Sequence, residues 1–230
     1  METATTKTPH SRVLKSKIRM VNPRLNEQLD RFWNHSNFSE VFVNHLFRLY
    51  HSVKASAQLL EGALERSKFL SPTCPVAAAL VVYFAEHVQE EKGHDEWLLD
   101  DMELLGIKRG NVTSQIPPTD VAALIGSQYY YMRHTHPVSL LAYLAIIEGN
   151  PPRQENLDFI ESKTDIPKAA LRSFYKHAEL DIVHSAELWA LIDSLPLTPW
   201  HSSLLGLNAM LVVEQIAVSM ENLLASFPEN

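Results

Sequence analysis

Two stretches of the sequence repeat the same arrangement of histidines and acids, at positions i, i+4 and i+7. The positions are His87, Glu91 and His94 in YFAEHVQEEKGHDEW, and His177, Asp181 and His184 in FYKHAELDIVHSAEL. With 3.6 residues per helical turn, such positions line one face of a helix. Two helices that turn these faces toward each other would bring imidazoles and carboxylates together, and those groups are metal ligands.

Each pattern also has an ordinary structural explanation. A single histidine on a helix face is more often a hydrogen-bonded structural residue than a ligand, and a charged pair is usually solvated. Both stretches, however, are flanked by apolar residues, among them Phe84, Trp97, Phe174 and Leu188. Imidazole and carboxylate groups on a face turned toward the core are costly unless they are paired or bind a metal. We therefore favour a metal site.

A further carboxylate, Glu148, closes the apolar segment VSLLAYLAIIEG and is followed by Gly149. Negative charge is unfavourable at the carboxyl end of a helix, so a cation would stabilise Glu148 there. Adding it to the better-supported positions gives three carboxylates and three imidazoles, more than one catalytic metal uses. Mixed sets of this kind, shared between helices, hold pairs of iron or manganese ions.

The elements that must position these groups are predicted to be helices. Apolar residues recur at helical spacing over residues 40–70, 74–105, 120–134 and 168–195, and no stretch shows the alternation of a strand. Residues 1–22 have no clean period and are predicted to be a flexible arm, whereas residues 23–230 are predicted to form a single all-α domain.

Composition narrows the function. The net charge of −7, without a basic patch, gives no footprint for nucleic acid. The single cysteine, Cys74, excludes an intramolecular disulfide, suits the cytoplasm, and leads us to expect no thiolate metal site. The first ten residues lack the apolar run of a secretory signal. Polar residues interrupt the apolar stretch 204–224, so we expect no membrane span.

The motifs Glu91-x-x-His94 and His177-x3-Asp181-x2-His184, with Glu148 at a helix end, resemble the haem-oxygenase-like diiron oxidases and oxygenases over about residues 35–225. The resemblance implies a haem-oxygenase-like bundle of about seven helices. It also implies two Fe(II)/Fe(III) ions, O2 as co-substrate and a homodimer, and it allows an external electron donor. The ligands that it implies are Glu91, His94, Glu148, His177, Asp181 and His184.

One position departs from the family pattern. Many members have a glutamate seven residues before the first-helix histidine, and this chain has His87 there. Either Glu91 takes the role of that carboxylate or His87 is an additional ligand, and we favour Glu91. Aromatic residues within helical reach of the ligands, or on a facing helix, are candidate walls of a substrate pocket. They are Trp97, Tyr130, Tyr143 and Tyr175.

The resemblance implies oxidation of a small organic substrate in specialised biosynthesis, by N-oxygenation of an amine or amino acid or by oxidative C–C cleavage. Two alternatives are a cofactor-free enzyme on the same fold, of the thiaminase (TenA) or quinone-cofactor-synthesis (PqqC) type, and a non-catalytic iron- or haem-binding protein. The thiaminase type needs a cysteine nucleophile in its pocket, and Cys74 precedes the first ligand helix. That placement counts against this alternative.

Overall fold

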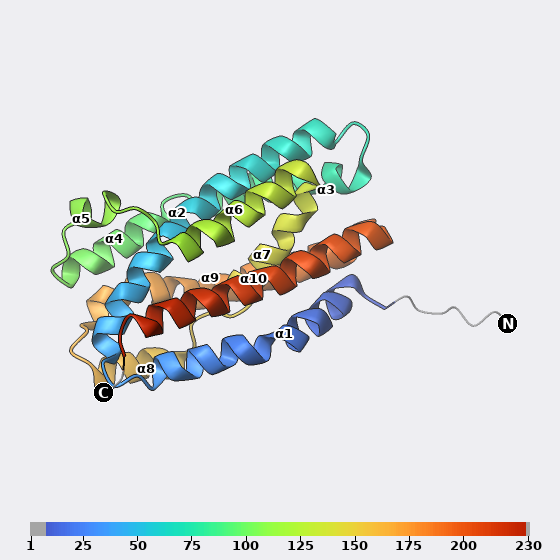
Figure 1. Cartoon of the computed structure of the whole chain (residues 1–230). Coiled ribbons are helices and arrows are strands. Elements are labelled where there is room, and N and C mark those ends of the chain that lie inside the picture. The colour runs from blue at the N-terminus through green and yellow to red at the C-terminus, as the bar shows by residue number, and fades with distance from the viewer. Residues whose placement is uncertain (1–7, 229–230) are drawn as a thin grey trace.

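The computed structural model describes residues 8–228, which form helices joined by turns (Figure 1). This part of the chain contains no strand, as predicted. The α-helices are α1 (His10–Trp33), α2 (Phe38–Leu70), α3 (Pro75–Glu90), α4 (His94–Leu104), α5 (Arg109–Thr113), α6 (Thr119–His134), α7 (Leu140–Ile147), α8 (Gln154–Lys163), α9 (Arg172–Ser194) and α10 (Pro199–Ala225). Two 3₁₀ helices, η1 (Pro137–Ser139) and η2 (Lys168–Leu171), precede α7 and α9.

The prediction of a flexible arm over residues 1–22 is wrong for residues 10–22, which form the first half of α1. Leu14, Ile18 and Leu25 recur on one face of this helix and are buried, while basic residues occupy the other faces. The basic residues obscured the apolar stripe, and it becomes a packing face only because α10 lies against it. Residues 1–7 of the predicted arm lie outside the described range.

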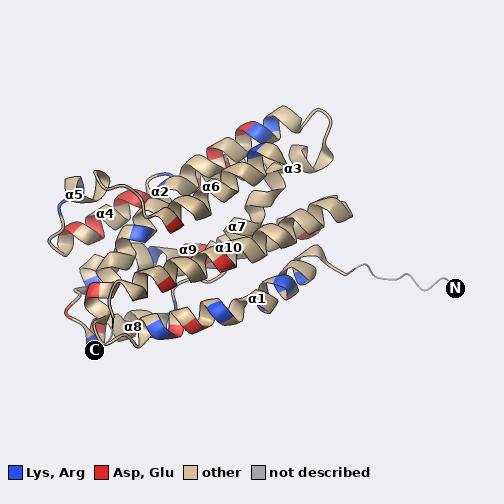
Figure 2. Ribbon diagram, in the orientation of Figure 1, with Lys and Arg blue, Asp and Glu red and all other residues tan. Residues whose placement is uncertain are grey.

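Helices α1 and α10 run side by side in the same direction (Figure 1). Arg24 of α1 pairs with two acids of α10, Glu214 and Glu221, the latter at 2.7 Å. Figure 2 shows basic residues on α1 beside acidic residues on α10. α10 is long and apolar enough to cross a membrane by length and composition alone, but half of its most apolar window is buried inside the protein. A core helix meets the same criterion, so we assign α10 to the core.

Helix α7 is almost completely buried, since each residue from 140 to 146 is buried. Asn208 of α10 donates hydrogen bonds of 2.8 Å to the Ser139 carbonyl and to Gln128, which fixes the start of the helix. Glu148 directly follows the last turn of α7 and is buried in the core. At Gly149 a Cβ atom would come within 2.2 Å of the Ala145 carbonyl oxygen, so the turn after Glu148 requires glycine.

The helix predicted over residues 74–105 is interrupted between α3 and α4. Gly93 ends the interruption with φ of 88°, in the left-handed region that disfavours residues with a Cβ. His87 and Glu91 therefore lie at the end of one helix and His94 at the start of another. The three side chains do not form the single stripe that their spacing predicted.

The interruption gives a prediction about two glycines. Gly93→Ala should lower the free energy of unfolding by about 1 kcal/mol, because alanine is strained at positive φ. Gly126→Ala should raise it by about 0.5–1 kcal/mol, because Gly126 lies inside α6 with open space around it. Urea unfolding measures both. Equal effects of the two substitutions would contradict a special backbone requirement at Gly93.

Candidate metal centre

The predicted metal-ligating residues come together in two adjacent groups. Within each group, ligand atoms of all three residues lie within 4.8 Å of one another. The groups are His87, Glu148 and His184, and Glu91, His94 and His177. The remaining predicted ligand, Asp181, is buried and interacts electrostatically with Glu148 of the first group and Glu91 of the second. All seven side chains thus belong to one centre.

The first group joins the ends of α3 and α7 to the middle of α9. His87 Nε2 lies 3.0 Å from Glu148 Oε1, and the rings of His87 and His184 are 5.0 Å apart at 61°. His87 stands where the family pattern has a glutamate, and the structure places it inside the centre. We take it as a full member of the candidate ligand set.

The second group joins the α3–α4 interruption to the first turns of α9. His94 Nδ1 lies 3.2 Å from Glu91 Oε2, and the rings of His94 and His177 meet edge to face at 5.0 Å. His177 Nδ1 lies 2.8 Å from the Ser173 carbonyl oxygen, which can only accept, so Nδ1 carries the proton. The unprotonated Nε2 of His177 is therefore free to bind a metal.

The two groups adjoin each other, because His184 Nδ1 lies 3.9 Å from Glu91 Oε1. A carboxylate that sequence reasoning missed, Glu90, is also near, with Oε2 3.3 Å from His87 Nδ1 and 3.7 Å from His184 Nε2. It is half exposed. Its spacing alone gave no signal, since it falls outside the i, i+4, i+7 pattern.

Asp101 of α4 holds the start of α9 in place. It is fully buried, and its carboxylate accepts hydrogen bonds from the backbone N–H groups of Arg172 and Ser173 and from the Ser173 hydroxyl. Asp101 lies seven residues after His94 on the same helix, and Ser173 is the residue whose carbonyl orients His177. The Asp101 carboxylate thus joins α4 to the start of α9, next to the residues of the second group.

Several buried polar atoms of the centre lack a hydrogen-bond partner. They are Glu148 Oε2, His184 Nδ1 and His94 Nδ1, whose contact with Glu91 Oε2 at 3.2 Å lacks hydrogen-bond geometry. Leaving buried polar atoms unpaired is costly, and native structures keep few of them. Each of the three belongs to a residue type that binds transition metals. The donor set and its unpaired atoms therefore fit a metal centre.

Charge and burial act against each other in this centre. Burial raises the pKa of Asp181 to about 8, and Glu148 and Glu91 add to the effect. Burial also raises the pKa of Glu148 despite its hydrogen bond with His87, and Glu148 in turn raises the pKa of His87. Both shifts favour a proton held within the His87–Glu148 pair. Of the three carboxylates in the centre, Glu91 alone has a lowered pKa, because His94, His87 and His177 outweigh its burial.

A cavity of about 210 Å³ opens onto Glu91, Glu148, His177 and Asp181. Its other walls are mainly apolar. They are Leu49, Val53, Leu98, Ile147, Pro152 and Phe174, with His45, Ser56, Ser173 and Asn150 as polar members. His45 has no recognisable sequence signal, because α2 carries no second ligand-type residue at helical spacing from it.

A sequence model of a family described as iron-containing redox enzymes matches residues 44–213. The chain belongs to this family. The match contains every residue of both groups and Asp181. It agrees with the metal chemistry that the donor set indicates.

Solved structures confirm the predicted haem-oxygenase-like fold. A domain of unknown function with this fold from Shewanella denitrificans OS217 superposes with a TM-score of 0.82 at 17% identity, covering 96% of this chain and 94% of its own. A TenA homologue from Pseudomonas syringae pv. tomato DC3000 gives 0.72 at 13% identity, with 94% and 93% covered. At these identities the likeness concerns the fold alone. No curated protein matches the chain in sequence.

The four aromatic residues predicted as pocket walls have different positions in this family member. Trp97 stacks on His94 at 4.0 Å, and the Tyr143 hydroxyl is 2.8 Å from Ser56 Oγ, so both contact residues of the centre or its cavity. Tyr130 is wrong as a wall, because it is 61% exposed on α6 beside His134. Tyr175 is also wrong, because its hydroxyl bonds Glu161 at the surface.

The raised pKa of Asp181 predicts how the stability of the metal-free protein depends on pH. Between its ordinary pKa of 3.8 and the folded-state value of about 8, the folded state holds a proton that the unfolded state releases. The free energy of unfolding should therefore fall as pH rises through this window. Asp181→Asn should flatten the fall in chelator-treated protein, as urea midpoints at pH 5 and pH 8 would show.

Asp165→Asn serves as the control, because Asp165 is an exposed carboxylate on the loop before η2. It should leave the pH dependence unchanged. If Asp181→Asn and Asp165→Asn give the same slope as the parent protein, Asp181 does not hold a proton in the folded state.

The Asp101 contacts predict a large loss of stability. Asp101→Ala leaves buried N–H groups at the start of α9 without acceptors, and should lower the free energy of unfolding by about 2–3 kcal/mol. Asp100→Ala, which removes only surface pairs with Arg109 and Arg172, should cost less than about 1 kcal/mol. Urea unfolding of the two variants compares them, and similar losses would refute the capping role.

Proposed function

We propose that this chain is a non-haem diiron enzyme that uses O2 to oxidise a small organic substrate in a biosynthetic pathway. The observation that carries the proposal is the pair of adjacent three-residue groups, each containing two imidazoles and a carboxylate within ligand distance. Asp181 interacts with both groups and supplies a third carboxylate. The description of the family as iron-containing redox enzymes supports iron as the metal.

The number of donors supports two ions. A catalytic zinc site usually uses three protein ligands, whereas seven side chains converge here. Carboxylates shared between two cations reduce their repulsion, and Glu91, Asp181 and Glu148 are the groups available for this. Glu91 stands at the contact between the two groups, 3.9 Å from His184.

Iron bound here would supply the electrons that reduce O2, which no side chain of the centre can provide alone. The protein's own contribution is to orient the metal-ligating side chains and the substrate, and to exclude water from the cavity. Ser173 fixes the His177 ring, and Asp101 fixes Ser173. The apolar cavity walls keep a compact substrate next to Asp181 and away from bulk water.

His45 is the candidate for orienting the substrate. It lines the cavity, its Nδ1 is buried without a partner, and burial lowers its pKa to about 4. It is therefore neutral at neutral pH and offers one hydrogen bond to a bound molecule. Asn150 and Ser56 are the other polar groups on the walls.

The two alternatives agree less well with the cavity. Cys74 does not line it, so a cofactor-free enzyme with a cysteine nucleophile finds no nucleophile there. A volume of about 210 Å³ is below the ~300–1,000 Å³ of pockets for drug-sized ligands, and haem needs a large pocket. A cofactor-free enzyme leaves the unpaired atoms of His94, Glu148 and His184 unused, whereas a non-catalytic iron-binding protein would use them and differs in consuming no O2.

The proposal predicts a defined iron content. Protein titrated anaerobically with Fe(II) should bind about two irons per chain and then consume O2 in a single turnover. His184→Ala removes one ligand of the first group, and should reduce the content to about one tightly bound iron and abolish the O2 uptake.

His134→Ala is the matched control, because His134 is an exposed histidine at the end of α6, away from both groups. It should bind iron and consume O2 like the parent protein. Binding of only trace iron by the parent protein, or an unchanged content in His184→Ala, would overturn the diiron proposal.

A further inference from the structure

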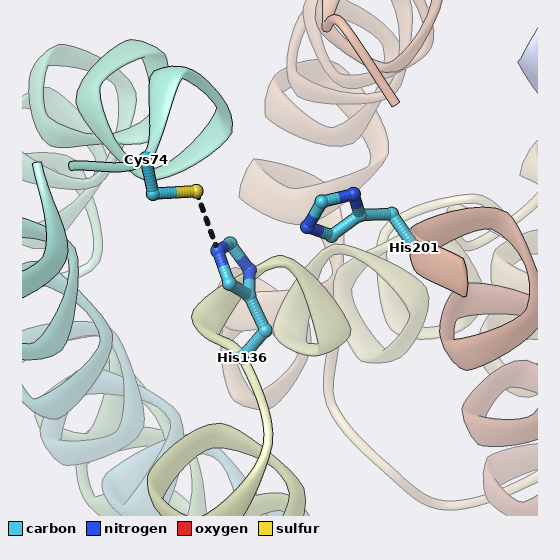
Figure 3. Close-up of side chains that lie close together, drawn as sticks. All are labelled: Cys74, His136 and His201. Carbon is cyan, nitrogen blue, oxygen red and sulfur yellow. Dashed lines mark hydrogen bonds between the residues drawn. The ribbon is translucent and has the colours of Figure 1, made fainter. Parts of the chain in front are cut away.

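A third group of ligand-type side chains lies outside the candidate metal centre. Cys74, His136 and His201 bring a sulfur and two ring nitrogens within 4.8 Å of one another. Cys74 directly precedes α3, His136 directly precedes η1, and His201 lies in the first turn of α10. Figure 3 shows the three side chains turned toward one another.

This group is remote from the centre described above. Cys74 and His87 stand 13 residues apart at the two ends of α3, which corresponds to about 20 Å along the helix axis. The cavity walls include none of the three residues. Whatever binds here therefore does so independently of the proposed iron site.

Hydrogen bonds hold each ring at Nδ1, so Nε2 is the ring nitrogen left for the group. His136 Nδ1 accepts a hydrogen bond of 3.1 Å from the Val138 N–H, and its Nε2 lies 3.3 Å from Cys74 Sγ. His201 Nδ1 is 2.9 Å from the Thr198 hydroxyl. The two rings meet nearly at right angles, at 4.8 Å and 73°.

The protonation states favour metal binding by neutral rings. His136 is only 6% exposed, and burial lowers its pKa to about 4, so it is uncharged at neutral pH. A neutral imidazole is the form that binds metals. Cys74 and His201 are half-buried, which leaves a route for an ion from solvent.

We propose that Cys74, His136 and His201 form a site for a single Zn²⁺ ion, with Sγ and the two Nε2 atoms as ligands and a fourth position open to water. Mixed sulfur and imidazole ligands suit zinc, and sites with three protein ligands keep a fourth position free. Binding replaces the thiol proton, which is released to solvent. A single cysteine therefore does not exclude a thiolate ligand, contrary to our expectation from the sequence.

One feature limits the affinity. To bind through Nε2, His136 must carry its proton on Nδ1, and it then gives up the hydrogen bond from Val138. The loss of one such bond weakens binding by about tenfold. His201 meets a similar cost, because its Nδ1 accepts a hydrogen bond of 3.3 Å from the Thr198 N–H.

Cobalt tests the site, because Co²⁺ adopts zinc geometry and a thiolate ligand gives it a charge-transfer absorption band. Once the candidate metal centre is filled, the full chain should develop this band with about one further equivalent of Co²⁺ and lose it when excess Zn²⁺ is added. Cys74→Ser should abolish the band, and His201→Gln should weaken Co²⁺ binding by about tenfold or more. Absence of the band in the parent protein overturns the proposal.

Two controls separate this site from others. His134→Gln, an exposed histidine of α6, and His184→Ala, in the candidate metal centre, should both keep the band. A Co²⁺ affinity that is unchanged in both His136→Gln and His201→Gln would mean that the thiol binds cobalt without this group, which refutes the site. Because Cys74→Ser can misfold, the parent protein is also alkylated with and without Zn²⁺. Zn²⁺ added at one equivalent beyond the amount that fills the candidate metal centre should slow the reaction of Cys74, and an unchanged rate counts against the proposal.

Discussion

The structure depends on the neutralisation of negative charge inside the protein. Glu91, Glu148 and Asp181 are carboxylates that share a largely buried space, and Glu148 also stands at the carboxyl end of α7, where the helix dipole opposes its charge. Without cations the protein meets this constraint with protons, as the raised pKa values of Asp181 and Glu148 show. Cations bound by the same side chains would neutralise the carboxylates instead. They would also give a partner to the buried atoms His94 Nδ1, Glu148 Oε2 and His184 Nδ1. The centre is therefore built for a charge greater than that of the imidazoles alone.

The surrounding helices convert this electrostatic requirement into fixed geometry. α7 is buried along its length, so Glu148 has little freedom, and Gly149 allows the chain to turn directly after it. Asp101 fixes the first turn of α9. Three of the metal-ligating residues, His177, Asp181 and His184, lie on this helix. Gly93 separates α3 from α4, and the separation lets His87 join one group while His94 joins the other. Backbone constraints at these few positions thus determine the arrangement of the whole centre.

The sequence predicted the helical class and the residues of the centre, because chemistry at helical spacing is visible locally. It failed where the deciding interaction is distant. A continuous helix over residues 74–105 placed His87, Glu91 and His94 on one face, whereas the interruption at Gly93 divides them between the two groups. Asp101 meets Ser173 across 72 residues, so its capping role has no local pattern. The apolar stripe of α1 became recognisable only once α10 covered it. Tyr130 faces solvent and the Tyr175 hydroxyl bonds Glu161, both for reasons of helix orientation that spacing does not contain.

The two sites differ in how ready their imidazoles are to bind a metal. His177 Nδ1 donates a hydrogen bond to the Ser173 carbonyl oxygen, so its Nε2 already carries the lone pair that a cation needs. His136 is held in the opposite tautomer, because the Val138 N–H can only donate, and its Nε2 carries the proton instead. The first arrangement is preorganised and the second must exchange a proton before it binds. Because the backbone groups beside the rings impose these tautomers, the fold itself ranks the candidate metal centre above the Cys74 site in affinity for ions that suit both.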